Sequence, residues 1–351
     1  MKIRIVLFLL LSNVVASYNV LASNDSSSGS EQKTTPSTVQ IDFEALYQMP
    51  EPPEYTKFPF YGAYLFSIAN QKTPQALNPD APTPDNVTQV MDVEFKEIDG
   101  INLGMDIYQP KGDKTPNPLI LIIHGGGWEG GDKHDYRPYG INFAAMGYTT
   151  ASVNYRLSGQ APFPAQFEDI RDAIMYLQEH AAKYNIDPSR MTIFGSSAGG
   201  HLTSFIGFAA NSPNLPYLED VDEESIKAII TIYGPQDLTL ADIRLRPDTQ
   251  KFMGGTFEEV PDVYREASPI NHLDMNDPPV LVIHGTLDSI VPAKHSELLV
   301  EKLKELEIPH TYDPIEGWSH VMDFFSPIAE RTLWQCYQFL KEKMPSDEML
   351  I

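Results

Sequence analysis

Short apolar runs alternate with amphipathic stretches over most of the chain, and this alternation predicts the fold class. The run 119–123 is apolar throughout, as is typical of a strand buried on both faces. Residues 167–184 bring Ile170, Ile174 and Leu177 onto one face, which predicts a helix. The other expected strands are 90–98, 103–108, 148–155, 191–194, 226–233, 280–283 and 310–313, and the other expected helices follow residue 197 and span 293–306 and 324–343.

Strands that alternate with helices predict an α/β fold with a mostly parallel sheet covered by helices on both faces. We expect it to occupy 90–345, beginning with a hairpin that turns at Asp99-Gly100. Residues 235–277 break the alternation with scattered charges and short amphipathic pieces. An insertion after the C-terminal end of a strand lies over the edge where such sheets bind ligands. We interpret it as a small lid; a purely structural excursion is the alternative.

The N-terminus has the pattern of a secretory signal peptide. Lys2 and Arg4 give a positive start, and residues 5–11 form an apolar core that is too short to span a bilayer. We expect the signal peptide to be 1–22, with cleavage after Ala16 as the alternative. The sequence therefore predicts a secreted or periplasmic protein with no membrane insertion.

Residues 23–89 precede the regular pattern and are expected to form two parts. Residues 23–38 are rich in Ser, Thr and Gln and are expected to be disordered. Residues 40–88 combine prolines with aromatic side chains, which resist regular structure but need burial. This N-terminal arm either wraps over the main domain or forms one wall of a substrate cleft.

Composition and charge exclude several classes of function. The hydrophobic fraction of 42% is that of a globular protein, and a net charge of −23 argues against nucleic-acid binding, which needs clustered Lys and Arg. Cys336 is the only cysteine, so no intramolecular disulfide is expected. The histidines show no metal-ligand spacing, so no metal is expected.

Candidate chemistry begins at Gly195-Ser196-Ser197-Ala198-Gly199, which fits the G-x-S-x-G nucleophile elbow. It follows an apolar strand and opens a helix, so a strained turn would present the Ser197 hydroxyl at the top of the sheet. Small residues are required because side chains on the glycines would collide with neighbouring backbone. Taken alone, the pentapeptide could also be an ordinary Gly/Ser turn.

A second motif, His124-Gly125-Gly126-Gly127-Trp128, follows the buried strand 119–123 directly. Glycines at this place let the backbone approach a substrate and direct its amides to one point. We predict that the amides of Gly126 and Gly127 form an oxyanion hole together with the amide of Ala198, the residue after the serine.

The serine needs a base to take its proton and an acid to orient that base. In this arrangement the chain order is serine, acid, histidine. Asp288 follows the strand 280–283, and His320 follows the last short strand, so both loops leave the C-terminal edge of the sheet. We therefore predict a catalytic triad of Ser197, Asp288 and His320.

The remaining polar and aromatic candidates have weaker interpretations. Trp128 and Trp318 suit the flat faces of sugars or phenolic rings and are predicted to bind substrate, although core packing would explain either one. We expect His124 to brace the glycine loop, and His201 and His284 to be buried supports. The rival acids, none of which follows the strand expected to carry the acid, are Asp313, Glu316 and Asp323.

The chain from about 90 to 343 resembles the α/β-hydrolase superfamily in its hormone-sensitive-lipase-like branch. Within it, 124–133 (HGGGWEGGDK), 154–165 (NYRLSGQAPFPA) and 267–270 (ASPI) are similar to the bifunctional feruloyl and acetyl xylan esterase type. The resemblance implies cofactor-free hydrolysis of esters, often of acyl groups on plant or algal polysaccharides, and its triad matches the one predicted above. Ser196 stands where many elbows of that branch carry Asp, and the first 90 residues are not covered.

The sequence thus predicts a secreted serine carboxylic-ester hydrolase that works through an acyl-enzyme on carbohydrate carrying acetyl or feruloyl groups. Short or compact acyl groups are expected because charges interrupt every hydrophobic run of 235–277, which leaves no apolar stripe for a long chain. The alternatives are a general short-chain carboxylesterase or lipase that acts on other esters, and a hydrolase-like binding module.

Overall fold

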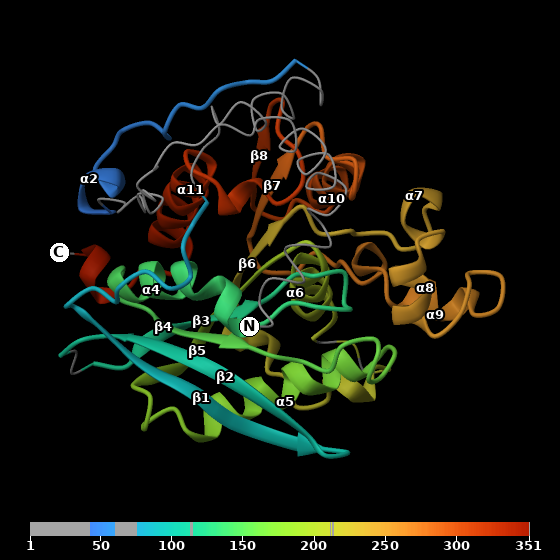
Figure 1. Ribbon diagram of the computed structural model, residues 1–351, viewed down its shortest axis with the longest axis horizontal. Helices are drawn as coiled ribbons and strands as arrows, with labels where there is room; N and C mark the ends of the chain where they lie inside the picture. The colour runs from blue at the N-terminus through green and yellow to red at the C-terminus, as the bar shows by residue number, and fades with distance from the viewer. Residues whose placement is uncertain (1–42, 60–75, 113–114, 211, 213, 351) are drawn as a thin grey trace, which may run out of the picture.

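The computed structural model describes residues 43–59, 76–112, 115–210, 212 and 214–350 (Figure 1). The expected signal peptide and the expected disordered start lie outside these residues, as do residues 60–75 of the N-terminal arm. Within the part of the chain that is described, no helix has the length and apolar character needed to cross a membrane.

An eight-stranded sheet forms the centre of the described structure, in the order β1-β2-β4-β3-β5-β6-β7-β8. Strand β2 pairs antiparallel with β1 and β4, and all other neighbours pair in parallel, which confirms the expected α/β fold and its first hairpin. The strands are β1 (Val87–Ile98), β2 (Ile101–Pro110), β3 (Asn117–Ile123), β4 (Thr149–Val153), β5 (Ile186–Ser196), β6 (Ile226–Ile232), β7 (Val280–Gly285) and β8 (His310–Ile315).

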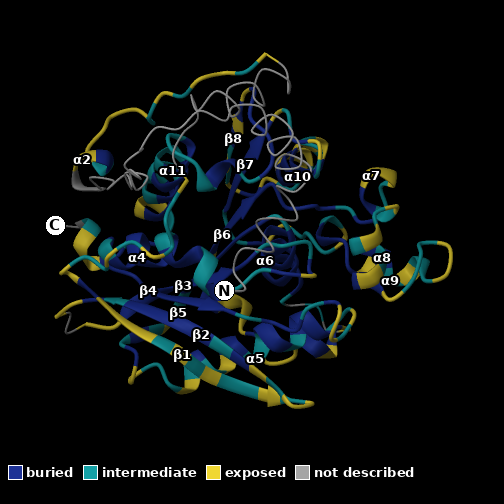
Figure 2. Ribbon diagram, in the orientation of Figure 1, coloured by how far each residue is buried: buried dark blue, intermediate teal, exposed yellow. Residues whose placement is uncertain are grey.

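Helices cover both faces of the sheet because the central strands are apolar on both sides. In β3, Leu119 and Leu121 face one core, and Ile120 and Ile122 face the other. Helices α5 (Ala165–Glu179), α6 (Ala198–Ala209) and α10 (Lys294–Glu305) pack into the first core, and α4 (Arg137–Ala145) and α11 (Ile328–Lys343) pack into the second. Figure 2 shows this buried centre in dark blue.

Two elements show the largest differences from their expected bounds. Helix α5 ends at Glu179, because the chain turns at His180 and leads into the sheet. Strand β5 starts at Ile186 rather than near 191, since Ile186 pairs with Asn117 at the start of β3. The second difference arises from pairing with a strand far away in the sequence.

Residues 235–277, here called the lid insertion, form three short helices after β6. They are α7 (Ala241–Arg244), α8 (Pro247–Met253) and α9 (Pro261–Glu266), and they project together from one side of the sheet (Figure 1). Ile243, Phe252 and Tyr264 are buried and join the first core, whereas the outer residues are exposed. The insertion therefore packs firmly on the domain through one face.

The described part of the N-terminal arm lies over α11 and the loop after β8. Helix α2 (Phe43–Tyr47) stacks the ring of Tyr47 on Tyr337 of α11, with the ring centroids 4.4 Å apart. Further along, Leu77 donates its amide to the carbonyl of Phe324 at 2.8 Å. The described part of the arm therefore contacts the main domain, and residues 60–75 lie outside the described residues.

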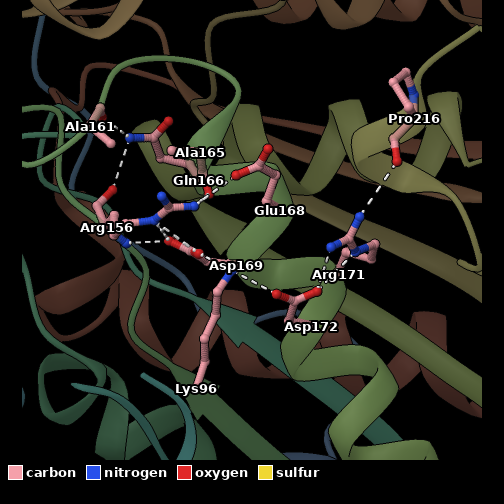
Figure 3. A network of polar contacts seen from close by, with 10 residues as sticks. All are labelled: Lys96, Arg156, Ala161, Ala165, Gln166, Glu168, Asp169, Arg171, Asp172 and Pro216. Atoms are coloured by element: carbon pink, nitrogen blue, oxygen red, sulfur yellow. Dashed lines mark hydrogen bonds and ion pairs between the residues drawn. The ribbon is translucent and has the colours of Figure 1, made fainter. Parts of the chain in front are cut away.

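The motif at 154–165 is held by a buried ion network (Figure 3). Arg156 donates from Nε to both carboxylate oxygens of Asp169 on α5, at 3.1 and 2.8 Å, and Lys96 of β1 reaches the same carboxylate at 2.7 Å. Gln166 donates to the carbonyl of Arg156 at 2.9 Å. Since Ser158 in this loop donates its amide to the carbonyl of Trp128 at 2.7 Å, the network also supports the glycine loop.

Candidate active site

Ser197 occupies the sharp turn between β5 and α6. Its φ of +56° and ψ of −124° are unusual for a residue with a side chain, and such strain is typical of functional turns. The flanking glycines have no room for a Cβ, which would lie 2.5 Å from the carbonyl oxygen of Gly199 if added to Gly195, and 2.1 Å from that of Ile123 if added to Gly199. The elbow thus has the geometry that the motif predicts.

The three residues of the predicted triad form one hydrogen-bonded chain. The Oγ of Ser197 lies 2.8 Å from Nε2 of His320, and Nδ1 of His320 lies 2.6 Å from Oδ2 of Asp288. They come from the β5–α6 turn and the loops after β8 and β7, so the parallel sheet brings together residues up to 123 positions apart. Asp288 and His320 are buried, and Ser197 is partly exposed.

The environment of Asp288 keeps it ionised. Burial would raise the pKa of this carboxyl, but the facing His320 and His284 hold it well below its usual value. Its other oxygen, Oδ1, accepts the amides of Ile290 and Val291 at 2.8 and 3.0 Å. A fixed carboxylate can orient the imidazole and stabilise its protonated form.

The rival acids have other partners. Asp313 accepts two hydrogen bonds from Arg331 of α11, at 2.8 and 2.7 Å. Glu316 pairs with Lys57 on the surface, and Asp323 accepts the hydroxyl of Tyr233.

The glycine loop lies against the nucleophile. A Cβ on Gly125 would be 3.2 Å from Cβ of Ser197, and Gly126 and Gly127 have φ of +121° and +60°, which favour glycine. Among the described residues, the amides of Gly126 and Gly127 donate to no protein group. The amide of Ala198, the first residue of α6, has no acceptor within its own helix. Free donors are therefore present on both sides of Ser197.

A small pocket lies beside Ser197. Its walls come from the glycine loop, the elbow, the lid insertion and the loop after β7. The lining residues are Gly127, Trp128, Ser197, Ala198, Pro235, Ile243, Arg246, Asp248, Ile290 and Val291. Gly126 is not among them; its carbonyl closes the loop by accepting the amides of Glu129 and Gly130, at 3.2 and 3.1 Å.

The two tryptophans differ in position. Trp128 lines the pocket but is 3% exposed, because it stacks on Phe252 of α8 at 4.6 Å and donates to His201 at 3.2 Å. The expectation that Trp318 binds substrate is corrected by the structure. Trp318 is 1% exposed, donates to the carbonyl of Thr56 at 2.7 Å and packs in the second core, because the N-terminal arm covers it.

Three histidines occupy the supporting positions expected for them. His124 lies 2.8 Å from the carbonyl of Gly125, within the glycine loop. Burial lowers the pKa of His201 to about 4, so its neutral ring accepts from Trp128 and donates to the carbonyl of Ala267. His284 is fully buried, and its two nitrogens contact Ser296 and the carbonyl of Val291 at 2.7 and 2.8 Å.

Sequence reasoning missed a buried polar network beneath the elbow. Ser196 is hydrogen-bonded to the hydroxyl of Tyr136, and Asp323 accepts the hydroxyl of Tyr233. Burial raises the pKa of Asp323 to about 7. The ring of Tyr233 lies against His320, with centroids 4.5 Å apart. The signal in the sequence that could indicate this network is Ser196, which stands where many elbows of the hormone-sensitive-lipase-like branch carry Asp.

The arm also fixes the loop that carries His320. The amide of Glu316 donates to the hydroxyl of Tyr55 at 3.0 Å, and the ring of Phe58 lies 5.5 Å from that of Trp318. Gly317 has a φ of +82° and no space for a Cβ, which would lie 2.1 Å from the amide nitrogen of Phe58. The described arm therefore contacts the residues just before His320.

The fold and this hydrogen-bonded chain define the class of α/β-hydrolases that carry a serine, a histidine and an aspartate at the C-terminal edge of the sheet. Within this class, the chain belongs to the BD-FAE family of bifunctional acetyl xylan and feruloyl esterases, whose profile matches residues 105–303. The matched segment contains Ser197 and Asp288, and His320 lies beyond it.

Comparisons with known proteins agree with this family. The chain is 30% identical over 236 residues to esterase LipC of Mycobacterium tuberculosis. The aligned segment covers 61% of this chain and 58% of LipC, so the chain spans less than two thirds of that protein. The structure of a truncated carbohydrate esterase from gut microbiota is similar, with a TM-score of 0.63 and 27% identity, over 78% of this chain and all of that one. The structure of propionate-bound Est2 of Thermogutta terrifontis is also similar, with a TM-score of 0.62 and 25% identity, over 77% of this chain and 99% of Est2.

Proposed function

We propose that the chain is an exported serine carboxylic-ester hydrolase that removes short acyl groups, acetyl above all, from carbohydrate. The observation that carries this proposal is the chain of hydrogen bonds from Ser197 through His320 to Asp288, beside a small pocket with free amides. A nucleophile, a base and an oriented acid in one line are what acyl transfer requires.

The geometry indicates the steps. His320 takes the Ser197 proton at Nε2 as Oγ attacks the ester carbonyl, and the amides of Gly126, Gly127 and Ala198 hold the oxyanion. Protonated His320, stabilised by Asp288, then gives its proton to the leaving alcohol, and an acyl-enzyme remains on Ser197. His320 next deprotonates a water molecule that attacks this ester, and collapse of the second tetrahedral intermediate frees the acid and restores the Ser197 hydroxyl.

The pocket supports small acyl groups. The space that a water molecule can reach inside it is about 20 Å³, far below the range of roughly 300–1,000 Å³ usual for the pockets of drug-sized ligands. Its apolar walls include Ile243, Ile290 and Val291, and its polar part consists of Arg246 and Asp248. The propionate bound in Est2 of Thermogutta terrifontis is an acid of the size proposed here.

The carbohydrate part of the proposal has the support of the family and of the gut carbohydrate esterase. Its test is a substrate panel with the purified full chain. We expect kcat/KM to fall from p-nitrophenyl acetate through butyrate and octanoate to palmitate, and acetate to be released from acetylated xylan. Methyl ferulate tests whether an aromatic acyl group is accepted as well. A rise in kcat/KM toward palmitate would show a lipase instead.

The export part of the proposal rests on the charged start and apolar core at the N-terminus. When the gene product is expressed in a bacterium that exports it, we expect N-terminal sequencing of the protein outside the cytoplasm to begin at Ser23. A start at Ser17 would select the earlier cleavage site, and a product with Met1 intact would contradict export.

A further inference from the structure

A charged pair from the lid insertion forms the polar part of the pocket beside Ser197. Arg246 precedes α8, and Asp248 lies in the first turn of that helix. Nε and Nη2 of Arg246 donate to the two carboxylate oxygens of Asp248, at 3.0 and 2.6 Å. The two side chains are 31% and 17% exposed, so the pair is half-buried and still reaches solvent.

Each member of the pair is also held in place by backbone. Nη1 of Arg246 donates to the carbonyl of Ile290 at 3.1 Å, and the amide of Thr249 donates to Oδ1 of Asp248 at 2.9 Å. A Cβ on Gly127 would lie 3.1 Å from Oδ2 of Asp248, so the pair sits directly against the glycine loop. Its position next to the reacting groups is therefore fixed before a substrate binds.

The pair keeps hydrogen-bonding capacity that the described residues do not use. A guanidinium has five N–H donors, and three of those on Arg246 are engaged by Asp248 and Ile290. A carboxylate oxygen accepts about two hydrogen bonds, and Oδ2 of Asp248 accepts one within the described residues. Free donors and a free acceptor thus lie side by side at the pocket.

A hydroxyl group is the ligand that matches such a site, because it both donates and accepts a hydrogen bond. An alkyl chain would instead remove water from a charged pair and return no hydrogen bond, which is unfavourable. The apolar walls, Ile243, Ile290 and Val291, remain available for the small acyl group.

We propose that Arg246 and Asp248 form a subsite that binds hydroxyl groups of the sugar from which the acyl group is removed. The inference rests on the proposed function and specifies how the alcohol side of the ester is recognised. The sugar ring lies against the lid insertion, and hydroxyls next to the acylated position bond to the guanidinium and carboxylate. A purely structural role for the pair would be small, since partly exposed ion pairs contribute little to stability.

The experiment compares two substrates that share an acetyl group and differ in the alcohol. Arg246→Gln, Asp248→Asn and wild type are assayed on acetylated xylo-oligosaccharide and on p-nitrophenyl acetate. We expect kcat/KM on the oligosaccharide to fall about tenfold or more in each variant, as for the loss of a hydrogen bond to a charged group. On p-nitrophenyl acetate, which has no sugar hydroxyls, we expect a smaller loss in both variants, so that the ratio of kcat/KM on the oligosaccharide to kcat/KM on p-nitrophenyl acetate falls.

Lys251→Gln is the matched control, because Lys251 lies on α8 and pairs with Glu129 outside the pocket, at 2.8 Å. It should leave kcat/KM on both substrates unchanged. A parallel loss on both substrates in the Arg246 and Asp248 variants would overturn the subsite, since the pair would then only hold the catalytic loops. Unchanged values on both substrates would overturn it too. Wild type that cleaves p-nitrophenyl acetate but not the oligosaccharide would instead refute the proposed function.

Discussion

Ser197→Ala is expected to lower kcat by about a millionfold, the usual size of the loss when a triad nucleophile is removed. The hydroxyl of Ser197 is the atom aligned with Nε2 of His320, and no other described hydroxyl takes that position. The fold should be retained, because the alanine methyl fits wherever the serine Cβ lies and α6 still begins at Ala198. The measurement is kcat on p-nitrophenyl acetate, with thermal unfolding as a check of folding.

Ser204→Ala is the control for this variant. Ser204 is also a buried serine of α6, and its hydroxyl has no hydrogen-bond partner among the described residues. It should keep nearly the full activity of wild type. If Ser197→Ala retained more than about a tenth of wild-type turnover, where a millionfold loss is usual, the nucleophile would be a different group.

Asp288→Asn is expected to lower kcat by about ten-thousandfold, less than the loss of the nucleophile. The carboxylate accepts a hydrogen bond from Nδ1 of His320 at 2.6 Å, so Nε2 is left free to accept the Ser197 proton. An amide nitrogen at this place would donate to Nδ1 and force the proton onto Nε2, where it blocks the transfer. The amide oxygen can still accept from Ile290 and Val291, so the loop should keep its shape.

Asp313→Asn is the matched control, because Asp313 lies on the neighbouring strand β8 and bonds to Arg331 instead of a histidine. Its kcat should remain close to that of wild type once the protein is folded, even if the melting temperature falls. A mild loss in Asp288→Asn together with a severe loss in Asp313→Asn would move the acid to position 313.

The fold and the three residues of the hydrogen-bonded chain could be predicted because each leaves a local signal. A buried parallel strand has a continuous apolar run in its sequence, such as 119–123. The residues that follow such strands lie at one edge of the sheet. Asp288 and His320 are predicted from this position together with the chain order of serine, acid and histidine. No contact between them had to be known.

Residues whose role depends on contacts between distant segments could not be placed in the same way. The sequence predicts that Trp318 binds substrate, yet Thr56 and Phe58 of the arm contact it in the structure. No sequence pattern in residues 50–60 indicates that contact. Arg246 and Asp248 are two of the charges that interrupt the hydrophobic runs of 235–277, and nothing in the sequence distinguishes them from the others. In the structure both line the pocket, beside the α8 helix that packs Phe252 on Trp128.

The polar network beneath the elbow was hidden for a related reason. It joins residues from four separate parts of the chain: Tyr136, Ser196, Tyr233 and Asp323. In the sequence, each of these residues can be interpreted as an ordinary structural residue, either in a turn or in the core. Only the fold brings them together under the nucleophile.

The central claim is that Ser197 carries the acyl group during turnover. Its most direct test is acid quenching of the enzyme within the first turnovers of p-nitrophenyl acetate, followed by peptide mapping with mass spectrometry. We predict a burst of p-nitrophenol of about one per active site and the mass of one acetyl group on the peptide that contains Ser197, at that residue. An acetyl group on another residue, or full activity without any covalent intermediate and without a burst, would contradict the account.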